Sequence, residues 1–293
     1  MGVDHYENFP VASLLCPPAL RPPIRAIYGF ARTADDLADE GDASPADRLD
    51  ALREFGSELQ RAVRGEPPGP RWPRVFGPLG PVIAQHRLPP DLLAALLSAF
   101  EQDVTCRRYP DRAALLDYCS RSANPVGRLL LHLYGLRDAG ALARSDDICT
   151  ALQLINFWQD LGVDASRGRV YLPATDCRRH GFEADALVDS LRPDAAACTP
   201  AFESAVEAAV AEACDWAEQL MRRGAPLVHE VPGRAGWELR GVVQGGLRIV
   251  EKIRAIGHRT RTRRPTLDAT DLPRLAWRSM RMTRAAVLAA VPA

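Results

Sequence analysis

Hydrophobic residues recur at intervals of three and four positions through most of this sequence, and alternating runs rich in valine, isoleucine and threonine are nearly absent. Because the helical repeat is 3.6 residues and the strand repeat is two, this spacing predicts an all-α protein. Helices are expected at about 24–41, 44–63, 90–106, 111–136, 145–165, 199–223, 235–258 and 270–289. Helices joined by short connections favour a bundle.

The segment "GEPPGPRWPRVFGPLGP" at 65–81 contains six prolines. Since proline lacks the amide hydrogen that a helix interior needs, this segment is expected to be a loop or a broken helix. Helical patterning resumes directly after it, so we interpret it as an excursion within one domain that covers residues 1–293.

A helix start is predicted at Ser145, which is followed by Asp146 and Asp147. Their carboxylates would complement the positive end of the helix dipole. This acidic pair is therefore assigned a structural role.

The sequence has 37 basic and 37 acidic residues and a formal net charge of zero. No overall field would recruit nucleic acid or an anionic membrane, so any polyanion must be bound locally and no nucleic-acid partner is expected. The seven cysteines form no C-x-x-C pair, which favours reduced thiols in a cytoplasm over disulfides or a zinc site. No run of about 18 apolar residues is present to span a bilayer.

Two stretches carry aspartates four residues apart: "ARTADDLADE" contains Asp35 and Asp39, and "QLINFWQDLGVD" contains Asp160 and Asp164. Helical residues at this spacing are rotated by only about 40°, so each pair shares a face and its charges repel. Magnesium prefers oxygen ligands and often keeps substrate phosphates in its shell, so each pair could bind a metal and a diphosphate. The first pair alone could equally be the solvated end of a helix.

The second pair lies in an almost wholly apolar run, where unpaired carboxylates cost several kcal/mol. Gln153, Asn156 and Asp160 are spaced by three and four, which places their polar groups in one stripe of this helix. A polar stripe inside a core indicates a cavity.

Three segments, "AIYGFARTADDLADE", "YCSRSANPVGRLLL" and "LQLINFWQDLGVDASRGRVYLP", resemble the conserved blocks of the squalene and phytoene synthase family, in order and at compatible separations. The resemblance runs from about residue 5 to residue 260. The early segment "HYENFPVASLLCP" and the later "NFWQD" further resemble the bacterial hydroxysqualene synthase branch, which acts in hopanoid biosynthesis.

The resemblance implies a single-domain isoprenoid synthase bundle around a central apolar cavity that binds magnesium and a prenyl diphosphate. By position, the metal ligands are expected to be Asp35, Asp39, Asp160 and Asp164. Catalytic roles are expected for Tyr28, Arg32, Tyr118, Asn156 and Gln159. Substrate contacts are expected for Asn8, Phe9, Arg32, Val126, Gly127, Gln153, Asn156, Phe157, Arg169 and Tyr171.

Aromatic rings could stabilise a carbocation by roughly 0.5–2 kcal/mol each when desolvated. The candidates are Phe9, Tyr28, Phe30, Tyr118 and Phe157, of which two or three are expected to act and the rest to be core. Gly127 would interrupt its helix, which suggests a kink or room for the prenyl chain.

Two positions depart from the family pattern. The family usually has an arginine directly before Asp160, where this sequence has Gln159, and a serine before Phe9, where it has Asn8. Both changes fall at the metal and phosphate end, so they bear on the reaction and not on the fold.

The expected reaction is therefore conversion of presqualene diphosphate and water to hydroxysqualene and diphosphate, with Mg²⁺ and without NADPH. Two alternatives stay open. One is condensation of two farnesyl diphosphates to presqualene diphosphate or squalene, and the other is a non-catalytic assembly subunit of the same fold. Because the substrate is a lipid, peripheral membrane contact and coupling to other hopanoid-pathway enzymes are further expectations.

Overall fold

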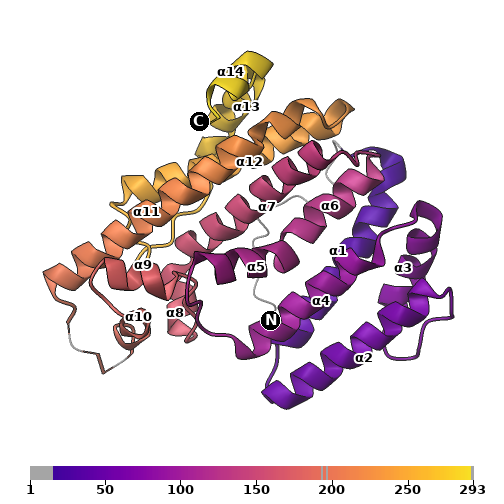
Figure 1. Cartoon of the computed structure of the whole chain (residues 1–293), viewed down its shortest axis with the longest axis horizontal. Coiled ribbons are helices and arrows are strands. Elements are labelled where there is room, and N and C mark those ends of the chain that lie inside the picture. The colour runs from indigo at the N-terminus through magenta and orange to yellow at the C-terminus, as the bar shows by residue number, and fades with distance from the viewer. Residues whose placement is uncertain (1–15, 193, 196, 292–293) are drawn as a thin grey trace.

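Helices make up nearly all of the regular structure, as the apolar spacing predicts. The computed structural model describes residues 16–192, 194–195 and 197–291 (Figure 1). These residues contain no β-strand, and one isolated bridge joins Arg108 to Val170. Asn8 and Phe9 lie outside the described residues.

The first four long helices pack on one another. They are α1 (Arg21–Asp39), α2 (Pro45–Val63), α3 (Pro73–His86) and α4 (Pro90–Thr105), and a short 3₁₀ turn, η1 (Pro18–Leu20), precedes them. Each of the four has a proline in its first turn, where no amide hydrogen is needed. Phe30, Phe55 and Phe76 meet inside this group of helices.

Helix α3 corrects the prediction of a proline-rich loop at 65–81. The loop ends at Trp72, and the helix continues through Pro78 and Pro81. Phe76, Leu79 and Ile83 are buried along one side of it. Burial of this apolar stripe against α1 and α2 outweighs the two backbone hydrogen bonds that the prolines cannot form.

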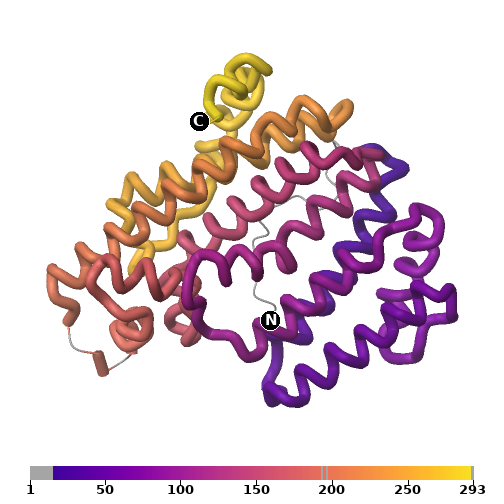
Figure 2. Tube along the Cα trace, viewed as in Figure 1, coloured from indigo at the N-terminus to yellow at the C-terminus, as the bar shows by residue number. Residues whose placement is uncertain are grey.

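The second group of helices is arranged around α7 (Ala139–Gln159). Figure 2 shows this helix between α5 (Arg112–Ser122) and α6 (Asn124–Leu133) on one side and α11 (Pro200–Gly224) and α12 (Gly233–Ala255) on the other. A turn of 3₁₀ helix, η2 (Ala225–His229), joins α11 to α12.

Two predicted helix boundaries in this group were wrong. The helix expected at 111–136 is two helices that meet at Ala123, because Pro125 cannot donate a hydrogen bond back across the junction. Helix α7 begins at Ala139 and not at Ser145, since Asp138 caps it by accepting a hydrogen bond of 2.8 Å from the amide of Ala141.

Asp146 and Asp147 therefore lie inside α7 and not at its start. Asp146 pairs with Arg128 of α6, and Asp147 pairs with Arg223 of α11. Their role is structural, as predicted, but it is to join neighbouring helices.

Shorter helices complete the described chain. Helix α8 (Leu161–Ser166) follows α7 directly, and α9 (Ala174–Arg179) and α10 (Ala184–Asp189) were not predicted. The helix expected at 270–289 is divided into η3 (Ala269–Asp271), α13 (Leu272–Arg281) and α14 (Arg284–Ala289), because Met282 leaves the helical conformation and Thr283 caps a new helix.

The buried side chains form two clusters that follow this division. One consists of residues of α1–α4 together with Leu129 of α6 and Leu88, and the other extends from Ala99 and α5 to α14. The seven cysteines all lie in described residues and none is in a disulfide. No described helix is long and apolar enough to cross a membrane.

Candidate active site

The first aspartate pair lies at the end of α1. Asp35 and Asp39 are one turn apart, as predicted. Arg32 lies one turn earlier. Its Nη1 is 3.3 Å from Oδ2 of Asp35, and its Nη2 is 2.7 Å from Oδ1 of Asp36. It also pairs with Glu40 at 3.0 Å. The guanidinium of Arg32 is thus held by carboxylates of its own helix and of the residue that follows it.

Asp39 is joined to the segment that follows the second aspartate pair. Arg169 donates two hydrogen bonds to its carboxylate, one of them 2.8 Å long. Burial alone would raise the pKa of Asp39, but the hydrogen bond and charge of Arg169 lower it. The backbone amide of Arg169 also donates to the carbonyl of Asp164 over 2.9 Å. This arginine therefore connects the two aspartate pairs.

The second aspartate pair spans the junction of α7 and α8. Asp160 lies between the two helices, and its amide donates to the carbonyl of Asn156 over 2.9 Å. Asp164 lies in α8, where burial and the charge of Asp160 raise its pKa to about 7. The four-residue spacing thus brings these carboxylates close enough to repel.

Asp160 is covered by residues 256–268, the segment between α12 and α13 that we call the strap. Arg264 of the strap donates to both carboxylate oxygens of Asp160, and its Nη2 lies 3.2 Å from Oδ2. The buried side-chain amide of Gln159 donates to the carbonyl of Pro265 over 2.7 Å. In this structure Gln159 therefore anchors the strap, and the role proposed for it beside the diphosphate stays a prediction.

The strap also touches α8 backbone to backbone. The amide of Gly162 donates to the carbonyl of Thr260 over 3.2 Å. A Cβ atom on Gly162 would lie 2.1 Å from the carbonyl oxygen of Arg261. Only glycine allows this approach.

Four aromatic rings gather beside the aspartates, and we call them the aromatic cluster: Tyr109, Tyr118, Phe157 and Tyr171. Phe157 and Tyr171 stack with centroids 3.7 Å apart and planes 4° apart. The ring centroids of Tyr118 and Phe157 are 6.2 Å apart, and those of Tyr109 and Tyr118 are 5.5 Å apart. Three of the residues predicted for the site are therefore brought together, whereas Phe30 packs in the other core cluster.

Asp103 of α4 belongs to this site and was missed. Tyr118 donates a hydrogen bond of 2.8 Å to its carboxylate, and Arg169 donates to its carbonyl over 3.4 Å. Burial raises the pKa of Asp103 to about 7, although the hydrogen bond from Tyr118 opposes this. A signal was present in the sequence, since Asp103 follows Leu96 and Ala99 by seven and four residues and so shares an apolar face of its helix.

Gly127 does not kink its helix, and its expected contact with the prenyl chain stays a prediction. A Cβ atom there would lie 2.4 Å from Oγ of Ser145 and 2.6 Å from Sγ of Cys149. The glycine lets α6 pack closely on α7. The helix is interrupted at Ala123, between α5 and α6, and not at Gly127.

The remaining predicted residues are partly exposed. Tyr28 of α1 and Gln153 and Asn156 of α7 are half-buried, while Val126 is 38 % exposed at the start of α6. Their contacts with substrate stay predictions.

The two aspartate pairs suit a hard cation only together with a ligand. No group of three or more histidine, cysteine, aspartate or glutamate side chains within the described part of the chain could hold a metal alone. Magnesium usually completes its shell with water and substrate phosphate oxygens, so a pair of carboxylates is a sufficient protein contribution. Burial and the charge of Asp160 raise the pKa of Asp164, so a bound cation would favour its charged form.

The comparisons with known proteins agree with this geometry. The family model described as squalene/phytoene synthase matches residues 3–271. A hydroxysqualene synthase from Zymomonas mobilis is 42% identical over 57% of this chain, and the chain spans 55% of that relative's length. A presqualene diphosphate synthase from Rhodopseudomonas palustris is 30% identical over 83% of this chain and 84% of its own.

A solved structure is similar over most of both molecules. The squalene synthase HpnC from Alicyclobacillus acidocaldarius has a TM-score of 0.75 and 36% identity, and the match covers 87% of this chain and 90% of the other. These matches confirm the family resemblance and the expected helical fold.

Proposed function

The chain belongs to the squalene/phytoene synthase family, and on this basis we propose that it converts presqualene diphosphate and water into hydroxysqualene and diphosphate with magnesium. The observation that supports this reaction most directly is the 42% identity to a hydroxysqualene synthase. The match covers only 55% of that relative's length, so the relative's reaction is proposed for this chain and is not shown by the match.

The aspartates would hold the metal in the proposed reaction. Bound magnesium would neutralise the diphosphate as it departs. The expected ligands are Asp35 and Asp39 from α1 and Asp160 and Asp164 from the junction of α7 and α8. Arg169 contacts both Asp39 and Asp164, which supports a single site in which both pairs would bind one substrate.

The aromatic cluster would protect the cation. When the carbon–oxygen bond of presqualene diphosphate breaks, the electron pair leaves with diphosphate and a cyclopropylcarbinyl cation remains. The faces of Tyr118, Phe157 and Tyr171 can stabilise positive charge and exclude bulk water.

Water would then add to the rearranged cation and lose a proton. Asp103 is our candidate acceptor, since its carboxylate lies beside the aromatic cluster through Tyr118 and has a pKa of about 7. A base with a pKa near the working pH can accept and later release a proton. No hydride is consumed, so no NADPH is required.

A second candidate is condensation of two farnesyl diphosphates to presqualene diphosphate. It is favoured by the longer match to a presqualene diphosphate synthase, over 83% of the chain. A non-catalytic subunit is less well supported, since both aspartate pairs are intact. Peripheral membrane contact and coupling to other hopanoid-pathway enzymes remain part of the proposal.

The test is to incubate the purified chain and magnesium separately with farnesyl diphosphate and with presqualene diphosphate, each with and without NADPH. Mass spectrometry of the extracts should show hydroxysqualene from presqualene diphosphate alone, unchanged by NADPH. Squalene in proportion to NADPH consumed, or presqualene diphosphate as the end product from farnesyl diphosphate, would overturn the proposed reaction. No product from either substrate would favour the assembly subunit.

A further inference from the structure

Helix α13 turns its hydrophobic side away from the protein. Among the described residues, the large hydrophobic side chains that are at least 50% exposed all belong to α13 and α14: Leu272 at 63%, Trp277 at 50%, Met280 at 61% and Leu288 at 56%. We call these four the C-terminal apolar patch.

The exposed positions follow the helical repeat. Leu272, Ala276 and Met280 are four residues apart, and Trp277 is five residues after Leu272, so they line one side of α13. Arg278, on the opposite side, has only 25% of its side chain exposed. A helix on the surface of a soluble protein normally buries its hydrophobic side, so this arrangement is reversed.

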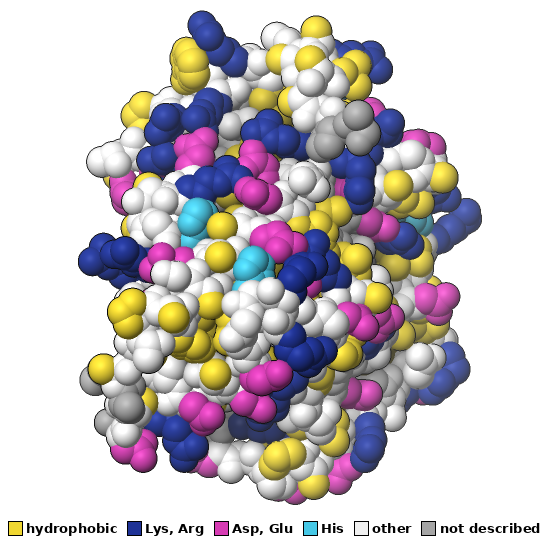
Figure 3. Space-filling view, turned by 60° about the vertical axis from the view of Figure 1, so that its left-hand side comes forward, with side chains coloured by type: hydrophobic (Ala, Val, Ile, Leu, Met, Phe, Trp, Pro, Cys, Tyr) yellow, Lys and Arg dark blue, Asp and Glu magenta, His cyan; other side chains and the backbone are white. Residues whose placement is uncertain are grey.

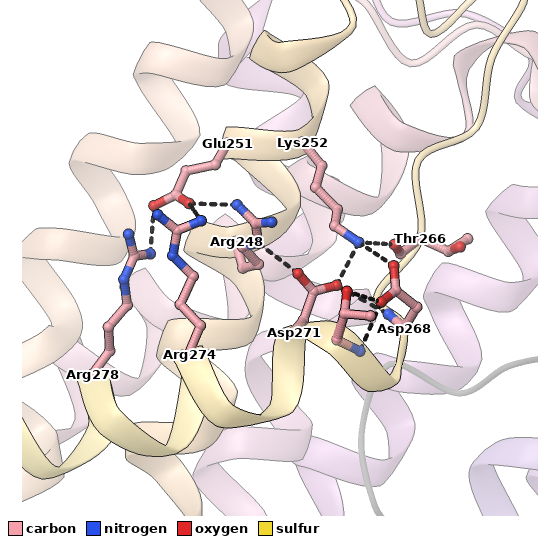
Figure 4. Close-up of polar contacts among 9 residues, drawn as sticks. Arg248, Glu251, Lys252, Thr266, Asp268, Asp271, Arg274 and Arg278 are labelled. Atoms are coloured by element: carbon pink, nitrogen blue, oxygen red, sulfur yellow. Dashed lines mark hydrogen bonds and ion pairs between the residues drawn. The ribbon is translucent and has the colours of Figure 1, made fainter.

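Ion pairs hold α13 in this orientation. Figure 4 shows Arg274 and Arg278 of α13 directed toward Glu251 of α12. Asp271, at the start of α13, accepts a hydrogen bond of 2.7 Å from Arg248 and pairs with Lys252. The polar side of α13 is thus fixed to α12, and its hydrophobic side is left facing outward.

The surface around the patch is basic. Residues 272–293 contain four arginines and no acidic residue. Among the described ion pairs, none involves Arg281 or Arg284, and the guanidinium of Arg281 lies 4.2 Å from the centre of the Trp277 ring. The top of the molecule in Figure 3, where these helices lie, carries hydrophobic and arginine side chains together.

We propose that the C-terminal apolar patch docks on the surface of a bilayer that contains anionic lipids. Leucine, methionine and tryptophan would enter the boundary between headgroups and acyl chains, and Arg281 and Arg284 would meet the lipid phosphates. Tryptophan favours this boundary, and the arginines supply charge complementarity. This inference assigns a surface to the membrane contact included in the proposed function, but it does not rest on the proposed reaction.

A second copy of the chain is a poorer occupant. In a twofold dimer the same patch would meet itself, so Arg281 and Arg284 of both copies would lie near one another. No acidic residue in 272–293 is present to compensate their repulsion.

The test measures co-sedimentation of the full chain with vesicles of phosphatidylcholine alone and of phosphatidylcholine with 30 mol% phosphatidylglycerol, a probe composition of about the charge of an anionic leaflet. The double variant Trp277→Gln/Met280→Gln should bind the anionic vesicles about ten-fold more weakly than the parent chain. The double variant Arg281→Gln/Arg284→Gln should lose most of the preference for the anionic vesicles, and added salt should do the same to the parent chain.

A matched control is provided by two exposed leucines. Leu272→Gln should weaken vesicle binding, whereas Leu116→Gln, on α5 and 38% exposed, should not. Thermal unfolding without vesicles should be unchanged in all of these variants, because each altered side chain is exposed or faces solvent.

Three results would overturn the proposal. One is that the parent chain stays in the supernatant with both kinds of vesicle. Another is that Trp277→Gln/Met280→Gln binds as tightly as the parent chain. The third is a dimer in solution, measured by light scattering, that the same double variant converts to a monomer, since a second copy would then cover the patch.

Discussion

In each aspartate pair, one carboxylate forms an ion pair with an arginine from a distant part of the sequence. Arg169 binds Asp39, and Arg264 binds Asp160. The aspartates themselves were predictable, because a four-residue spacing is visible in the sequence. Arg264 was not, since it is 104 residues from its partner and no local pattern marks it.

The first prediction concerns the proposed metal ligands. Asp35→Asn and Asp160→Asn should each lower turnover of presqualene diphosphate by at least about a thousand-fold, because each removes charge from the metal site. Circular dichroism should show an unchanged helical content. Full activity in either variant would contradict the metal assignment.

Asp147→Asn is the matched control for that experiment. It removes a carboxylate that joins α7 to Arg223 of α11, outside the proposed site. Its expected cost is about 1 kcal/mol of unfolding free energy with turnover retained.

The second prediction concerns Asp103. Its folded-state pKa of about 7 lies above the unfolded value, so the folded chain binds this proton more tightly and the stabilising effect is lost as pH rises toward 7. Asp103→Asn keeps an acceptor for Tyr118 and removes the buried charge. At pH 8 the variant should be more stable than the parent chain by about 2–4 kcal/mol in urea unfolding, and near pH 4 the difference should vanish.

Asp117→Asn serves as the comparison for Asp103. Asp117 is 67% exposed and pairs with Arg121, so its replacement should change stability by less than about 1 kcal/mol at either pH. Equal and pH-independent effects of the two variants would show that the pKa of Asp103 is not raised.

At the scale of elements, α2 was predicted closely because its cap and its apolar repeat are both visible in the sequence. Helix α2 begins after Ser44, whose hydroxyl accepts a hydrogen bond from the amide of Asp47, and its limits agree with the sequence prediction. Helices α9 and α10 escaped prediction because each has only six residues, too few to show a repeat. The early start of α7 was missed because its cap, Asp138, precedes the apolar run.

The third prediction uses the contact between the strap and α8. In Gly162→Ala the new methyl group would overlap the carbonyl of Arg261, so the strap must move and the pairing of Arg264 with Asp160 should weaken. We expect a loss of about 2–4 kcal/mol of unfolding free energy. In hydrogen exchange of the Gly162→Ala variant, the backbone amides of residues 256–268 should exchange faster than those of α2.

Gly77→Ala is its control. Gly77 also lies in a helix, but a Cβ atom there has no neighbour within 4 Å. Replacement should therefore stabilise α3 by about 0.5–1 kcal/mol. If both alanine variants gained stability, the close approach at Gly162 would be refuted.

At the scale of the whole molecule, the two aspartate pairs belong to different parts of the core. Helix α1 packs in the cluster of α1–α4, whereas α7 is central to the other cluster. The sequence predicted one helical domain with both pairs at one site. It could not predict the division of the core, because hydrophobic spacing identifies the buried side of a helix and not the helix that covers it.

This division leads to the last prediction. A ligand bound by both pairs joins the two parts of the core, so it should stabilise the molecule as a whole against unfolding. At a hundred-fold excess over its dissociation constant, a ligand adds about 2.7 kcal/mol. Magnesium with inorganic pyrophosphate should therefore raise the melting temperature by about 5 °C, and by more than either does alone, because the phosphate oxygens complete the metal shell.

The double variant Asp35→Asn/Asp160→Asn should lose this increase in melting temperature, and Asp147→Asn should keep it. The same increase in all three proteins would mean that the pyrophosphate binds elsewhere.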